Sequence, residues 1–188
     1  MNKILVEVSA KHCHLSKEDI KILFGESYQL TKLKQLTQPS DFACKETIDI
    51  KLGEKEIKNI RVVAPEREKT QVEISLTDAV GSGVIVPIKM SGDLNGSAGA
   101  VLIGPAGQVE IKEGVIVAMR HIHCSPTEAK KMGFKNGDNV SVKVKGDRSI
   151  IFEDVAVRTG EEYKLCLHLD TDEGNSAGIN KTGEGIIL

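Results

Sequence analysis

The chain has 188 residues, of which 40% are hydrophobic and 28% charged, so it is long enough and apolar enough to fold around a buried core. Its net charge of −2 and its aromatic content of 3% argue against a basic, base-stacking surface, which excludes a typical nucleic-acid-binding protein. No apolar run reaches the roughly 18 residues of a membrane-spanning helix, so we expect no membrane association.

Short strands dominate the predicted secondary structure. Segments that are β-branched, or that alternate apolar with polar residues, predict strands at Ile4–Val8, Thr47–Leu52, Ile57–Val63, Thr70–Ser75, Gly83–Met90, Gly99–Gly104, Gly114–Met119, Asn139–Lys145, Ser149–Arg158 and Lys164–Leu169. Short helices are predicted at Lys17–Phe24, Leu76–Val80, Pro126–Met132 and Thr171–Ser176. Many short strands with few helices predict a mainly β fold built of compact barrels.

The N-terminal residues and the cysteines predict a cytoplasmic protein. Met1-Asn2-Lys3 runs directly into the first predicted strand, without the charged and apolar regions of a signal peptide. The four cysteines have no CxxC spacing, so we expect reduced thiols that pack as small apolar side chains. They are Cys13, Cys44, Cys124 and Cys166.

A fourfold repeat marks the points where strands are predicted to meet helices. Each copy has a candidate metal ligand, one spacer, then Ser or Asp as a helix N-cap, and an acidic residue three positions later. The copies are His14-Leu15-Ser16 with Asp19, Glu73-Ile74-Ser75 with Asp78, His123-Cys124-Ser125 with Glu128, and His168-Leu169-Asp170 with Glu173. The repeat predicts four strand-to-helix corners, each with a ligand near the end of a strand.

Two His-X-His pairs supply most of the candidate ligands. They are His12 with His14 and His121 with His123, drawn from a chain with five histidines. Residues i and i+2 of a strand share a face, so both imidazoles of a pair can bind one ion or two neighbouring ions.

The repeat adds Glu73 and His168 to these pairs. Imidazoles with one carboxylate suit Zn²⁺, and six ligands favour a two-metal site over a single closed tetrahedral site. Cys166 shares a strand face with His168 and could approach the site, although we expect a buried apolar role for it.

Six segments extend in order from Val6 to about Gly178: VEVSAKHCHLS, APEREKTQVEISLTDA, SGDLNGSAG, RHIHCSP, IFEDVAVR and HLDTDEGNSAG. Together they resemble the PduL-type phosphate acyltransferases, also called phosphotransacylases or phosphate propanoyltransferases. The resemblance implies interconversion of acyl-CoA and phosphate with acyl phosphate and CoA. It also implies a homodimer.

The resemblance further implies two β-barrel subdomains, the first closed by both chain ends, with two zinc ions between them. Subdomain one would comprise residues 1–15 and about 114–188, and subdomain two about 16–113. The implied zinc ligands are His12, His14, Glu73, His121, His123 and His168. Phosphate binding is assigned to Arg67, whose planar, permanently charged guanidinium matches phosphate oxygens.

The N-terminus departs from the pattern of many relatives. Those relatives carry an amphipathic N-terminal extension that directs them into bacterial microcompartments, whereas the first motif here begins almost at Met1. We therefore expect the cytoplasm rather than a microcompartment lumen. The preferred acyl group, whether acetyl, propanoyl or similar, is left open.

Two other functions are consistent with the same ligands. A two-metal site could activate water and give a zinc-dependent hydrolase of a thioester or related acyl substrate, although Arg67 close to Glu73 favours phosphate. A non-catalytic scaffold with structural zinc is the second alternative, although structural sites close with four ligands and favour cysteine. No Ser-His-Asp arrangement is apparent, which favours direct transfer over an acyl-enzyme.

Two further segments have weaker predictions. Ser91–Gly99 contains three glycines but lacks the Lys-Ser/Thr ending of a P-loop. We expect a structural barrel turn there, with the CoA entrance as the alternative. Arg120 should point away from the metal ligands and form a salt bridge.

Overall fold

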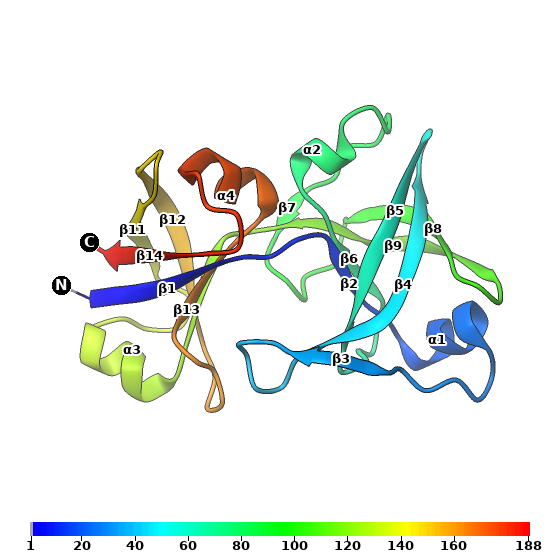
Figure 1. Cartoon of the computed structure of the whole chain (residues 1–188), viewed down its shortest axis with the longest axis horizontal. Helices are drawn as coiled ribbons and strands as arrows, with labels where there is room; N and C mark the ends of the chain where they lie inside the picture. Colours follow the sequence, from blue (N-terminus) through cyan, green and yellow to red (C-terminus); the bar gives the residue numbers. More distant parts are fainter. Residues whose placement is uncertain (1) are drawn as a thin grey trace. The chain divides into compact units, whose positions relative to one another are not determined.

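The computed structural model describes residues 2–188 and is mainly β, as predicted (Figure 1). The strands are β1 (Asn2–Val8), β2 (His12–His14), β3 (Lys32–Gln35), β4 (Phe42–Leu52), β5 (Lys55–Ala64), β6 (Gln71–Glu73), β7 (Ile88–Lys89), β8 (Ala98–Ile103), β9 (Gln108–Ala118), β10 (His121–Cys124), β11 (Asn139–Lys145), β12 (Ile150–Thr159), β13 (Cys166–Leu169) and β14 (Thr182–Ile187). The helices are α1 (Lys17–Phe24), α2 (Leu76–Ala79), α3 (Pro126–Met132) and α4 (Thr171–Ala177). None of these helices, within residues 2–188, is long and apolar enough to cross a membrane.

The chain divides into two compact units. Unit 1 comprises the described residues up to Ala10 together with Met119–Leu188, and unit 2 is Lys11–Ala118. The predicted division, at residues 15/16 and near 113/114, lies a few residues from these boundaries. The first boundary differs because β2 forms its ladder with β5 and β6, which places His12 and His14 in unit 2.

Unit 1 is a closed barrel with the strand order β1-β13-β10-β12-β11-β14. β1 and β14 lie side by side and pair antiparallel, from Asn2 opposite Ile187 to Glu7 opposite Thr182 (Figure 1). The prediction that both chain ends close one barrel is therefore confirmed. Its core is apolar and includes the fully buried Leu167, and burying each such side chain stabilises the fold by about 1.5–3 kcal/mol.

Unit 2 contains a second closed ring of strands, in the order β4-β5-β2-β6-β9-β8. β8 closes this ring because it pairs antiparallel with both β4 and β9. Its core is again made of buried aliphatic side chains and includes Cys13 and Cys44. Cys124 lies in the core of unit 1, so these three cysteines pack as small apolar side chains, as predicted.

All four predicted helix starts are capped by the residues that the repeat selects. The side chains of Ser16, Ser75, Ser125 and Asp170 each accept a hydrogen bond from the backbone N–H three residues later. The last three form complete capping boxes with their acidic partners, which satisfies two backbone donors at each helix start. In α1 the acidic residue, Asp19, instead accepts a hydrogen bond from the Thr70 hydroxyl.

Candidate functional site

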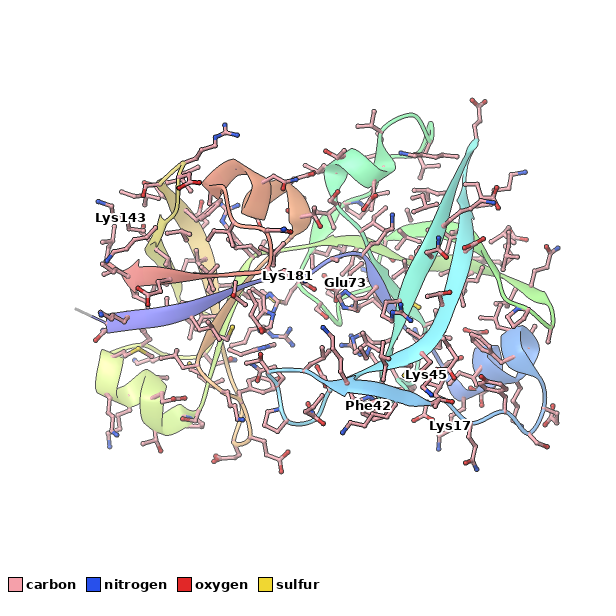
Figure 2. All side chains as sticks on the ribbon, viewed as in Figure 1. Lys17, Phe42, Lys45, Glu73, Lys143 and Lys181 are labelled. Atoms are coloured by element: carbon pink, nitrogen blue, oxygen red, sulfur yellow. The ribbon has the colours of Figure 1, made fainter. Side chains whose placement is uncertain are left out.

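Unit 2 brings His12, His14 and Glu73 together on two neighbouring strands. β2 and β6 pair antiparallel with His12 directly opposite Glu73, and His12 Nε2 lies 3.6 Å from Glu73 Oε2. The ring centroids of His12 and His14 are 5.4 Å apart, while Cys13 between them packs in the core. Figure 2 labels Glu73 on its strand. Strand alternation therefore places this predicted trio on one face.

His14 has the electronic state that a metal ligand requires. Its side chain is buried, and its Nδ1 has no hydrogen-bond partner within the described chain. Burial, followed by the charges of Arg67 and His12, lowers the pKa of His14 from its ordinary 6.5 to about 3, against a smaller opposing effect of Glu73. The imidazole is thus neutral at physiological pH, and an unsatisfied buried nitrogen is the kind of group that a cation would complete.

Gln71 holds Glu73 in place, and the sequence interpretation missed this residue. Gln71 is buried, and its Nε2 donates to Glu73 Oε1 at 2.6 Å and to Ser91 Oγ at 2.9 Å. Its Oε1 accepts a hydrogen bond from the backbone N–H of Gly92 at 2.8 Å. The i, i+2 spacing from Gln71 to Glu73 was the available signal, since both side chains share the face opposite the core residue Val72.

Arg67 is fixed beside the start of α1. Its backbone N–H donates to the carbonyl oxygen of Leu15 at 3.0 Å, and it forms an isolated parallel bridge with Ser16. Its Nη1 donates to Ser91 Oγ at 3.3 Å, which connects the guanidinium through Ser91 to Gln71. Together these hydrogen bonds form one network from Arg67 to Glu73.

An open cavity of about 470 Å³ lies against this network. Arg67, Gln71 and the segment Gly92–Asn95 contribute to its wall. Part of the Ser91–Gly99 loop therefore lines this cavity, whose wall carries basic side chains, Arg67 and Lys69, and acidic ones, Glu68, Asp93 and Glu113.

Unit 1 brings His121, His123 and His168 together. His121 lies opposite His168 in the antiparallel pair of β10 and β13, with the two rings stacked and their centroids 5.3 Å apart. The His123 ring centroid is 4.6 Å from that of His121 and 5.0 Å from that of His168. The second predicted trio thus shares one face of its sheet.

The surroundings of His123 favour a neutral imidazole. Burial, followed by the neighbouring His121, His168 and Arg158, lowers the pKa of His123 to about 2, and both of its ring nitrogens lack hydrogen-bond partners within the described chain. Tyr163 packs on the His123 ring at 4.2 Å between centroids. His121 Nδ1 lies 2.8 Å from the carbonyl oxygen of Met119 and donates to it, which orients the ring.

In neither trio do the three ligand atoms all lie within 4.8 Å of one another in this structure. Among residues 2–188, only Glu7, Cys166 and His168 place their ligand atoms all within 4.8 Å of one another. Zinc holds imidazole nitrogens at about 2.0–2.1 Å, so ligation by either trio requires side-chain rotation.

Arg120 is not part of the trio in unit 1. Its guanidinium Nη1 lies 2.9 Å from Glu173 Oε1, in the capping box at the start of α4. The prediction of a salt bridge for Arg120 is confirmed.

The described residues thus form two barrels, with a histidine cluster in each unit and an arginine beside an open cavity in unit 2. A model of the phosphate propanoyltransferase family matches residues 5–180. The chain therefore belongs to this family, and it is a phosphate acyltransferase.

Similar proteins support the assignment along nearly the whole chain. The phosphate propanoyltransferase of Thermotoga maritima is 50% identical over 98% of this chain and 88% of its own length. That of Clostridioides difficile is 46% identical over 95% of this chain and 85% of its own. That of Listeria monocytogenes is 42% identical, with 97% and 86% covered.

Proposed function

We propose that this chain is a zinc-dependent enzyme that transfers a short-chain acyl group between CoA and inorganic phosphate. The observation that carries zinc dependence is a pair of neutral imidazoles, the buried His14 and the half-buried His123: Nδ1 of His14 and both ring nitrogens of His123 are buried and lack partners within the described chain. Leaving such nitrogens unsatisfied is costly, whereas neutral imidazole is a preferred zinc ligand.

The ligands divide into two sets of three. We assign His12, His14 and Glu73 to one ion and His121, His123 and His168 to a second, because each set lies on paired strands of one unit. Three protein ligands leave a fourth position open, as in catalytic rather than structural zinc sites. When bound, Zn²⁺ supplies Lewis acidity that can polarise a carbonyl or stabilise a leaving sulfur.

Arg67 is the proposed phosphate-binding residue. Its fork of N–H donors can bind two phosphate oxygens, and Ser91 and the backbone contacts to the start of α1 limit its orientations. A phosphate oxygen attacks the thioester carbonyl carbon, the carbon–sulfur bond breaks, and CoA leaves as the thiolate. Gln71 holds Glu73 throughout, so that the carboxylate keeps its position on β6.

Direct attack by phosphate is favoured over a covalent acyl-enzyme. Ser91 is the hydroxyl nearest to Arg67 in the hydrogen-bond network, and its oxygen accepts from Arg67 and Gln71. Neither of these groups can act as a general base, so nothing in this network activates Ser91 as a nucleophile.

Phosphate-dependent CoA release tests the proposal. The zinc-loaded chain should release CoA from acetyl-, propanoyl- and butanoyl-CoA when phosphate is present, and acyl phosphate should accumulate in equal amount. Equal rates of release in phosphate-free buffer would instead support a zinc-dependent thioester hydrolase. Zinc that is required for folding but gives no turnover would support a scaffold.

We also propose that the chain is a cytoplasmic homodimer that binds neither nucleic acid nor membrane. The family resemblance supports the homodimer. The low net charge and the few aromatic residues argue against binding to nucleic acid. All four cysteines are buried thiols rather than disulfides, as is usual in a reducing compartment. Sedimentation equilibrium tests the dimer: a single species of monomer mass would contradict it.

A further inference from the structure

Cys166 differs from the other three cysteines. Cys13, Cys44 and Cys124 belong to the apolar clusters of the two barrels, and Cys166 does not, although it is fully buried. The reason is the alternation of β13, in which Leu167 and Leu169 face the core of unit 1. Cys166 therefore lies on the opposite strand face, together with His168.

The register of β1 against β13 brings a carboxylate to the same place. The two strands pair in parallel, with Leu5 opposite Cys166 and Glu7 opposite His168. Val6 is in the core, so Glu7 points to the non-core face. As a result, ligand atoms of Glu7, Cys166 and His168 all lie within 4.8 Å of one another.

This juxtaposition presents a carboxylate, a thiol and an imidazole to one small volume. A divalent cation is attracted to the carboxylate and can replace the thiol proton. Thiolate, imidazole and carboxylate are together the donor types that zinc prefers.

We propose that Glu7, Cys166 and His168 form an additional, inhibitory site for a thiophilic divalent cation such as Zn²⁺. On binding, the S–H bond of Cys166 breaks, its proton goes to solvent, and sulfur donates its electron pair to the metal. The inhibitory role rests on the proposed function, because it requires His168 to serve the catalytic trio of unit 1. A neutral imidazole has one lone-pair nitrogen, so His168 cannot ligate both ions at once.

Cobalt(II) spectroscopy tests the site itself. Metal-stripped, full-length protein titrated with Co²⁺ should develop thiolate-to-metal charge-transfer absorption in the near ultraviolet. Cys166→Ser should abolish this band, Glu7→Gln should shift its appearance to higher Co²⁺, and the matched control Cys44→Ser should retain it. Absence of the band in the unaltered chain, or its persistence in Cys166→Ser, would overturn the proposal.

Zinc inhibition tests the competition for His168. Excess Zn²⁺ should lower phosphate-dependent CoA release by the unaltered chain at least several-fold, whereas Cys166→Ser should remain active at the same zinc concentration. If Cys166→Ser does not fold, as judged by circular dichroism, Glu7→Gln should require more zinc for the same inhibition. Equal inhibition of the unaltered and altered chains would overturn the inhibitory role.

The two assays separate this proposal from the proposed function. Suppose that the cobalt band depends on Cys166 but the chain shows no phosphate-dependent CoA release. This result would support the metal site and would contradict both the transfer reaction and the inhibitory role. Normal transfer without the cobalt band contradicts the metal site alone.

Discussion

The two ligand trios lie at strand-to-helix corners of the same type but have different surroundings. In unit 2 the trio includes Glu73, which Gln71 holds, and Arg67 contributes positive charge near His14. In unit 1 the trio is entirely imidazole, with Tyr163 packed on His123 and the charge of Arg158 close enough to lower the pKa of His123. In the proposed function, unit 2 combines three ligands with phosphate binding by Arg67, whereas unit 1 contributes three imidazoles to the second ion. Changes in the two units should therefore have separable effects.

The largest effect is expected from His123→Ala in unit 1. Loss of one of three ligands should release the ion and remove several kcal/mol of transition-state stabilisation, which lowers kcat/KM by roughly a thousandfold or more. Steady-state CoA release measures this effect. Tyr163→Phe is the matched control, because it keeps the ring that packs on His123, and it should retain most activity. A fully active His123→Ala would break the assignment of unit 1.

Arg67→Ala in unit 2 should be less severe and should act through phosphate. Losing a charged hydrogen bond costs about 2–3 kcal/mol, or roughly a hundredfold in kcat/KM for phosphate. Zinc content should stay unchanged, which distinguishes this change from His123→Ala. The exposed Arg148→Ala is the control for loss of charge. An Arg67→Ala variant with the KM for phosphate of the unaltered chain would contradict the assignment.

Gln71→Leu tests the hydrogen bonds that hold Glu73 in unit 2. This near-isosteric change removes the donor to Glu73 and the acceptor for Gly92, and such changes behind a ligand typically lower metal affinity about 10–100-fold. Competition with a zinc chelator measures the affinity of each site. The exposed Gln108→Leu serves as control. The site in unit 1 should be unaffected, so equal weakening of both sites would contradict the account.

The last prediction concerns stability and not activity: it is the pH dependence of the unfolding of the metal-free chain. The folded-state pKa values of His14 and His123, about 3 and about 2, lie below the ordinary 6.5. Between pH 6.5 and about 3 the unfolded chain therefore binds more protons than the folded chain. The contribution of these two histidines to the free energy of unfolding should be largest above pH 6.5 and should decrease as pH falls toward 3. Denaturant melts at several pH values measure this decrease. His14→Gln should reduce the slope, and an unchanged slope would indicate that His14 is not held neutral.

Local signals explain how much of this site the sequence could predict. The four corners follow from capping residues and acids three positions apart, which act within one turn of helix. Gly83–Met90 was predicted as one strand, but only Ile88–Lys89 pairs, because Gly81 and Gly83 have positive φ angles that form turns. The shared face of His12 with His14, and of His121 with His123, follows from strand alternation, which is also local.

Contacts across long sequence distances were not predictable. The role of Gln71 depends on the loop at Ser91, which only the folded chain brings near. The meeting of Glu7 with Cys166 depends on the parallel register of β1 and β13, and this register is set by closure of the barrel rather than by either segment. The three-residue strand β2 is likewise formed by pairing with β5 and β6, which are distant in sequence.

Metal content measured by elemental analysis tests the central claim most directly. The unaltered chain, purified with zinc and freed of excess metal, should hold about two ions, one in each trio as argued from its three ligands. Glu73→Gln and His12→Ala should each lose the ion of unit 2 and keep the other, while His123→Ala should do the reverse. Unchanged zinc stoichiometry in all three variants would contradict the account.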